Sequence, residues 1–112
     1  MDSLLTRLEA ASEGSREMDG LITIQERPGF YPSVAIAEKD APHYTTSLDA
    51  KLPWENIVEM RYYIDPDGRD SAYTTIHEAE DGRLFEGKAK TEALARRIAA
   101  LRARGQERKP AS

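Results

Sequence analysis

Hydrophobic residues recur every three or four positions near both ends of the chain and alternate with polar residues between them. The helical spacing predicts helices over residues 3–13, 16–25 and 92–104. Ser15 and Thr91 precede the second and third of these helices and are suitable N-caps, and Gly105 is the expected C-cap of the last one. The last helix should bury a stripe made of Leu94, Ile98 and Leu101.

A period of two predicts three strands over residues 54–64, 71–80 and 83–89. The first strand has one mainly apolar face, typical of a half-buried antiparallel sheet. The members of this face are Trp54, Val58, Met60, Tyr62 and Ile64. Asp81-Gly82 predicts a two-residue hairpin in which both residues have positive φ. Residues 34–36 are a candidate fourth strand at the edge.

Residues 44–54 connect the helical and strand-like halves. Thr46 or Ser47 is expected to cap a helix of about two turns, ended by Pro53 because a residue before proline leaves the helical region. Leu48 and Leu52 should face the core. The fold class is therefore α+β: a three- to four-stranded antiparallel meander packed with N-terminal and C-terminal helices. Residues 1–105 form one domain, and residues 106–112 a flexible tail.

Composition limits the function classes. The chain has 112 residues, a net charge of −4 and no cysteine, so disulfides, zinc–thiolate sites and cysteine nucleophiles are excluded. No apolar run approaches the roughly 18 residues of a membrane span, and the N-terminus does not resemble a signal peptide. We expect a cytoplasmic protein that does not bind membranes.

Three segments together resemble a known family. They contain Arg16-Glu17-Met18-Asp19, then Tyr44-Thr45 with Ser47-Leu48-Asp49-Ala50 and Pro53-Trp54, and lastly an alanine- and arginine-rich end from Gly87 to Arg104. As a set they resemble the small "ABA sandwich" domain proteins of bacteriophages and prophages, over roughly half of the chain. The resemblance implies a layered α-β-α arrangement. It brings no assigned activity and no catalytic residues.

No pattern predicts catalysis, a cofactor or a metal site. Asp65, Asp67 and Asp70 resemble part of a calcium loop, but the twelfth position, which needs a carboxylate, is Ile76. A β-turn explains these aspartates better. His77 and its neighbour Glu78 are expected to point to opposite faces of a strand and not to converge. No nucleophile-elbow pattern surrounds Ser47, the serine near His43. The chain is therefore predicted not to be an enzyme.

Charge is unevenly distributed. The last 22 residues carry a net charge of +4 and the first 90 a net charge of −8. A nucleic-acid-binding regulator is therefore an alternative function, with four arginines of the last helix as its contacts: Arg96, Arg97, Arg102 and Arg104. On a helical wheel they surround the apolar stripe instead of forming one wall, which favours a solvated helix.

Protein binding is the leading prediction. Phe30 and Tyr31 lie in a proline-framed loop that either anchors a partner or covers the core, and Tyr63 and Tyr73 are expected on the second sheet face or its margin. With the aspartates of residues 65–70 they form the candidate contact set. The predicted role is a phage or prophage accessory protein that binds a host or phage protein, for example as an inhibitor of a CRISPR-type defence nuclease complex. A homodimer is also open because the sheet has edge strands; a small enzyme is the third alternative.

Overall fold

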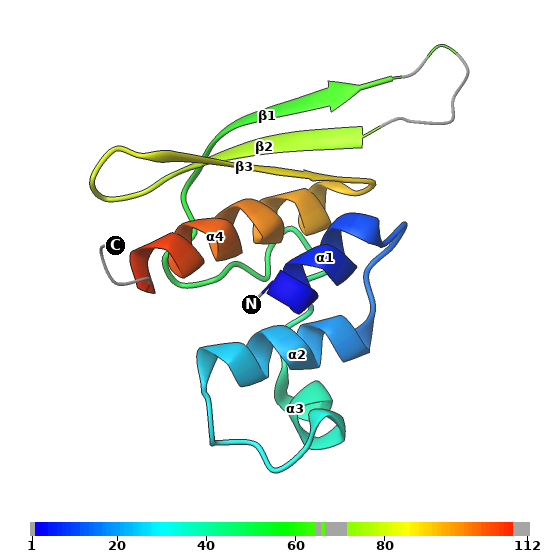
Figure 1. The fold of residues 1–112 in the computed structure, drawn as a ribbon. Coiled ribbons are helices and arrows are strands. Elements are labelled where there is room, and N and C mark those ends of the chain that lie inside the picture. The colour runs from blue at the N-terminus through cyan, green and yellow to red at the C-terminus, as the bar shows by residue number, and fades with distance from the viewer. Residues whose placement is uncertain (1, 65, 67–71, 109–112) are drawn as a thin grey trace.

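The computed structural model describes residues 2–64, 66 and 72–108. The elements are α1 (Asp2–Ala10), α2 (Arg16–Glu26), α3 (Val34–Asp40), β1 (Ile57–Tyr63), β2 (Ala72–Glu78), β3 (Leu84–Ala89) and α4 (Glu92–Arg108). The strands form one antiparallel sheet in the order β1-β2-β3. The predicted α+β fold, an antiparallel meander packed with N- and C-terminal helices, is confirmed (Figure 1).

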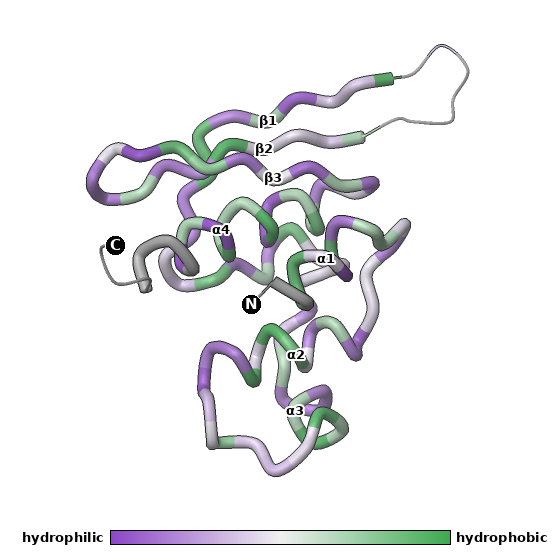
Figure 2. Tube along the Cα trace, viewed as in Figure 1, coloured by the Kyte–Doolittle hydropathy of each residue, from purple (hydrophilic) through white to green (hydrophobic). Residues whose placement is uncertain are grey.

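The core lies where α4 meets the sheet on one side and α1 on the other (Figures 1 and 2). The predicted stripe on α4 is fully buried. Gly87 of β3 permits the close approach, because a Cβ there would lie 2.1 Å from the Ala95 carbonyl oxygen. The Thr75 hydroxyl donates to the same carbonyl at 2.8 Å, so the sheet is fixed directly on the helix backbone.

The starts of α1, α2 and α4 were predicted well, but two helix ends were not, since α1 ends at Ala10 and not at residue 13. The hydroxyls of Ser15 and Thr91 each accept a backbone N–H at 3.2 Å, as expected of N-caps. However, α4 continues through Gly105 to Arg108, so the predicted C-cap is wrong. A glycine inside a helix costs only about 1 kcal/mol, and the following glutamine, glutamate and arginine favour helix. Residues 109–112 lie outside the described residues.

The edge strand predicted near residues 34–36 is wrong, because these residues begin helix α3. The Ser33 hydroxyl caps this helix by accepting from the Ile36 N–H at 3.3 Å. Arg16 of α2 donates to the carbonyls of Glu38 and Ala41 at its other end. The cap and the distant arginine together override the strand preference of valine and isoleucine.

The two-turn helix predicted after Thr46 or Ser47 is also wrong, since residues 44–55 form successive turns. Leu52 is buried as expected, but Leu48 is 44% exposed. Trp54 precedes β1 and packs at the margin of the core, where its indole N–H donates to the Ala100 carbonyl at 2.9 Å. The cause of the irregular backbone is Arg97, described below.

The hairpin between β2 and β3 exists, but its turn differs from the predicted one. Gly82 has φ of +86°, whereas Asp81 does not have positive φ. The loop is longer than two residues, with the Ala79 N–H donating to the Arg83 carbonyl at 2.9 Å. The Asp81 carboxylate accepts from the Arg83 backbone N–H at 3.0 Å, which keeps this turn closed without a second positive φ and lowers the pKa of Asp81.

Candidate protein-interaction surface

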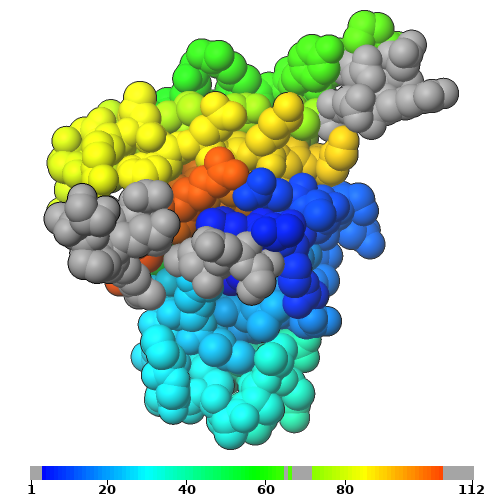
Figure 3. Space-filling model, in the orientation of Figure 1, coloured from blue at the N-terminus to red at the C-terminus, as the bar shows by residue number. Residues whose placement is uncertain are grey.

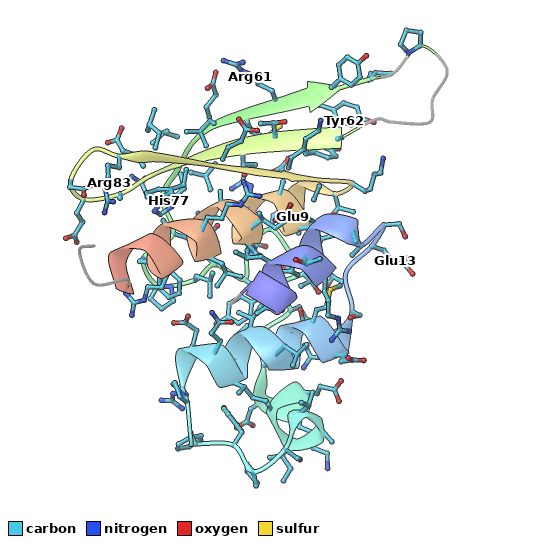
Figure 4. All side chains as sticks on the ribbon, in the orientation of Figure 1. Glu9, Glu13, Arg61, Tyr62, His77 and Arg83 are labelled. Carbon is cyan, nitrogen blue, oxygen red and sulfur yellow. The ribbon has the colours of Figure 1, made fainter. Side chains whose placement is uncertain are left out.

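Strand pairing assigns a face to each residue of β1. Met60 lies opposite Thr75, and Tyr62 lies opposite Tyr73. Opposed residues of an antiparallel pair share a face, and Thr75 contacts α4. Met60 and Tyr62 therefore lie on the face toward the helices, which we call the inner face (Figure 4).

The helices do not cover the inner face as far as β1. Helix α4 packs against β3 and β2, and β1 lies at the margin of the sheet (Figures 1 and 3). Met60, Tyr62 and Ile64 are consequently 42%, 48% and 66% exposed. The prediction that the apolar face of this strand is buried in the core is therefore wrong for these residues, because α4 does not reach across the sheet to β1.

Five exposed apolar residues of this strand form what we call the β1 apolar surface. Val58, where the pairing with β2 is irregular, and Tyr63, on the outer face opposite Ala72, complete it. Its members are Val58, Met60, Tyr62, Tyr63 and Ile64. The Tyr62 ring packs against the Tyr73 ring, with the ring centroids 4.4 Å apart. Because Tyr73 packs against the core, this part of the surface is connected to the core.

The structure separates the two tyrosines that the sequence placed together. Tyr73 lies on the inner face and packs against the core, whereas Tyr63 is exposed on the outer face. Tyr63 therefore belongs to the candidate surface directly. Tyr73 contributes to it by supporting Tyr62.

The outer face of β1 carries an ion pair. Glu59 and Arg61 lie on this face, opposite Ile76 and Thr74, and their side chains are 2.9 Å apart. Figure 4 shows Arg61 pointing away from the helices. Among the described residues, no strand pairs with the outer edge of β1, so its backbone groups face solvent there.

The Phe30-Tyr31 loop is a separate and smaller surface. Phe30 is 62% exposed; Arg27 stacks on its ring at 4.8 Å and Tyr31 meets it edge-on at 4.9 Å. The loop thus does not fold back over the core. It lies at the α2–α3 end of the molecule, opposite the sheet (Figures 1 and 3), so the structure does not bring it together with Tyr63.

The other predicted contacts and ligands give no site. Asp65, Asp67 and Asp70 lie outside the described residues. Within the described part of the chain, no three His, Asp or Glu side chains are grouped so that they could hold a metal ion. His77 is buried and its Nδ1 accepts from the Asn56 N–H at 3.0 Å, a structural role that fixes the start of β1.

Arg97 is a fully buried arginine. Its guanidinium is 2.6 Å from the Glu55 carboxylate. It also donates to the carbonyls of Tyr44 at 2.9 Å, Ser47 at 2.6 Å and Leu48 at 3.3 Å. A helix over these residues would engage the same carbonyls in its own ladder, so the arginine explains why residues 44–55 are irregular.

Burial shifts the pKa values around this arginine. It lowers the pKa of Arg97, against the opposing effect of Glu55. Burial also raises the pKa of Tyr44, with the charge of Glu26 as the next cause. The Arg97 and Glu55 side chains are at most 1% exposed and Tyr44 is buried, so the network has a structural role.

The four arginines of α4 whose side chains the structure describes do not form one basic face. Three of them lie on different sides of the helix, each engaged within the chain, while Arg97 is buried. Arg96 pairs with Glu92 at 2.7 Å and Arg102 with Glu9 at 2.8 Å, and the Arg104 guanidinium lies 4.6 Å from the Trp54 ring centroid.

In comparisons with known proteins, no family model, no curated protein and no solved structure matches this chain. Across residues 2–64, 66 and 72–108, no helix is both long enough and apolar enough to cross a bilayer.

Apart from Tyr63, the β1 apolar surface was missed by sequence reasoning, and the Arg97 network was missed entirely. The strand did carry one signal, namely apolar side chains on both of its faces, at Ile57 and Tyr63 as well as at Met60 and Tyr62. No comparable signal marks Arg97, because its ion-pair partner is 42 residues away in the chain.

Proposed function

We propose that this protein acts by binding other proteins through the β1 apolar surface. The observation that carries the proposal is the exposure of Met60 and Tyr62 on the helix side of the sheet, where a strand would ordinarily be covered. Contiguous exposed apolar residues mark interaction sites, and tyrosine is enriched among residues that dominate binding energy.

The geometry also suits strand addition. An exposed edge supplies backbone donors and acceptors, and the side chains on either side of it supply specificity. Tyr62 is positioned by Tyr73 and needs little reorganisation on binding, which lowers the entropic cost of association.

The resemblance to phage and prophage domain proteins supports a concrete form of this function. In that form, the protein is an accessory factor that binds a host or phage protein complex, with inhibition of a CRISPR-type defence nuclease as the specific hypothesis. The net charge of −4 would favour a target with a basic nucleic-acid groove. Binding of nucleic acid by α4 is less well supported, since its arginines have partners within the chain.

Affinity capture with matched variants tests the proposal. Tyr62→Ser should weaken retention of a host protein from lysate at moderate salt. Leu84→Ser is the control, because Leu84 is 61% exposed on β3 at the opposite edge of the sheet and should leave retention unchanged. Equal capture by both variants would remove the β1 apolar surface from the function.

A purified CRISPR-type nuclease complex tests the specific hypothesis. The unaltered protein should reduce DNA cleavage, and Tyr62→Ser should do so less. A shift of labelled DNA or RNA by the protein alone, declining steeply with salt, would instead favour the nucleic-acid alternative.

A further inference from the structure

We propose that the outer edge of β1 pairs with the same edge of a second copy of this chain, antiparallel about a two-fold axis at Met60. This inference rests on β1 being the interaction strand and names the partner that covers its backbone edge. The two sheets would join into one six-stranded sheet.

The charge pattern selects this register. A two-fold axis normal to the sheet must pass between one residue and its own copy. With Met60 at the axis, Glu59 of each copy lies opposite Arg61 of the other copy, which gives two cross-strand pairs of opposite charge. Both side chains are already on the outer face and 2.9 Å apart within one chain, so four alternating charges would come together.

Neighbouring registers lack this complementarity. An axis at Glu59 opposes two glutamates, and an axis at Arg61 opposes two arginines; like charges directly opposed destabilise a sheet. The Met60 register also overlaps most of β1, Ile57–Tyr63. It places Val58 of each copy opposite Tyr62 of the other, next to the irregularity that the β1–β2 pairing has between Ile57 and Glu59.

The other edge of the sheet is occupied within the chain. Arg102 of α4 donates to the Glu86 carbonyl of β3 at 2.9 Å, and the same guanidinium pairs with Glu9 of α1. Arg102 thus engages the β3 edge at one carbonyl, whereas in the described part of the chain no strand pairs with the outer edge of β1.

The dimer would enlarge the β1 apolar surface. A two-fold axis normal to the sheet keeps the inner faces of both copies on one side, so Met60 and Tyr62 of each would line one trough between the two α4 helices. The surface offered to a host protein would then be this trough built by two chains, because each β1 edge is paired with the other copy and is no longer open to strand addition by the host protein.

Charge variants test the pairing in the full-length protein by sedimentation equilibrium. The unaltered chain should reach twice its 12.6 kDa mass as concentration rises. Glu59→Arg alone and Arg61→Glu alone should each weaken the dimer about tenfold or more. A mixture of these two variants, or the double swap E59R/R61E, should restore it. Circular dichroism controls for folding.

Cross-linking tests the register, since the chain has no cysteine of its own. Directly opposed residues have Cα atoms about 4.5–5.5 Å apart, within reach of a disulfide. Met60→Cys should therefore form a dimer on mild oxidation. Tyr62→Cys should not, because its two copies would be offset by about 13 Å along the strands.

The outcomes separate this inference from the proposed function. A chain that stays monomeric at every concentration, or Tyr62→Cys cross-linking faster than Met60→Cys, would overturn the dimer. If a monomeric chain still captures a host protein in a Tyr62-dependent manner, the proposed function stands without it. If the chain dimerises but captures nothing, the proposed function falls and the dimer remains.

Discussion

Replacing Arg97 with methionine should destabilise the protein more than any surface substitution. Methionine has a similar length and no charge, so the core stays filled. Glu55 would be left as a buried carboxylate without its 2.6 Å partner. The carbonyls of Tyr44, Ser47 and Leu48 would lose their donor at the same time.

The magnitude follows from these losses. Removing one member of a buried ion pair costs about 3–5 kcal/mol. A carbonyl left unsatisfied adds about 1–3 kcal/mol where water cannot reach it. The free energy of unfolding should therefore fall by about 4 kcal/mol or more for Arg97→Met, a large share of the roughly 5–15 kcal/mol typical of a domain.

Urea unfolding followed by circular dichroism and by Trp54 fluorescence measures this loss. The matched control is Arg96→Met on the same helix, whose i,i+4 pair with Glu92 is worth only about 0.5 kcal/mol. Arg97→Lys should fall between the two, because lysine keeps the charge and loses the fork of donors. A loss for Arg97→Met no larger than that of the control would refute the assigned role.

Three further predictions concern packing and pH. Gly87→Ala should lower the free energy of unfolding by about 2 kcal/mol or more, since its Cβ would clash with the Ala95 carbonyl; an unchanged urea midpoint would contradict this. Leu52→Ala should lower the free energy of unfolding by about 2–5 kcal/mol because Leu52 is buried. Leu48→Ala should lower it by less than about 0.5 kcal/mol because Leu48 is exposed; equal losses would contradict this difference in burial. Folded Tyr44 has a pKa above 10.0, so its unfolded form loses the proton first. The free energy of unfolding should be constant below about pH 10 and should decrease above it. Tyr44→Phe should make this decrease smaller when urea unfolding is measured as a function of pH.

Local signals predicted much of this fold. The caps at Ser15 and Thr91 and the apolar stripe of α4 depend on residues within one or two turns, so their positions could be read from the sequence. Alternation and the Asp81-Gly82 pair likewise predicted the β2–β3 hairpin. In each case neighbouring residues determine the structure.

The failures depend on distant partners. The segment after Tyr44 has caps typical of a helix. However, its backbone carbonyls accept hydrogen bonds from Arg97, which lies more than 40 residues further along the chain. Residues 34–36 have the composition of a strand, but they begin helix α3. Arg16 stabilises the other end of this helix by donating to the Ala41 carbonyl. The alternation in β1 placed Met60 and Tyr62 correctly on one face, but whether that face is covered depends on the reach of α4 across the sheet.

Photo-cross-linking in host cells tests most directly whether the β1 apolar surface is the binding surface. p-Benzoylphenylalanine would replace Tyr62 in one variant and Leu84 in another, both exposed positions on the sheet. A host-protein adduct is expected from position 62 and not from position 84, whereas an adduct with a second copy alone supports only the dimer. Adducts from position 84 alone, or from neither position, would contradict binding through this surface.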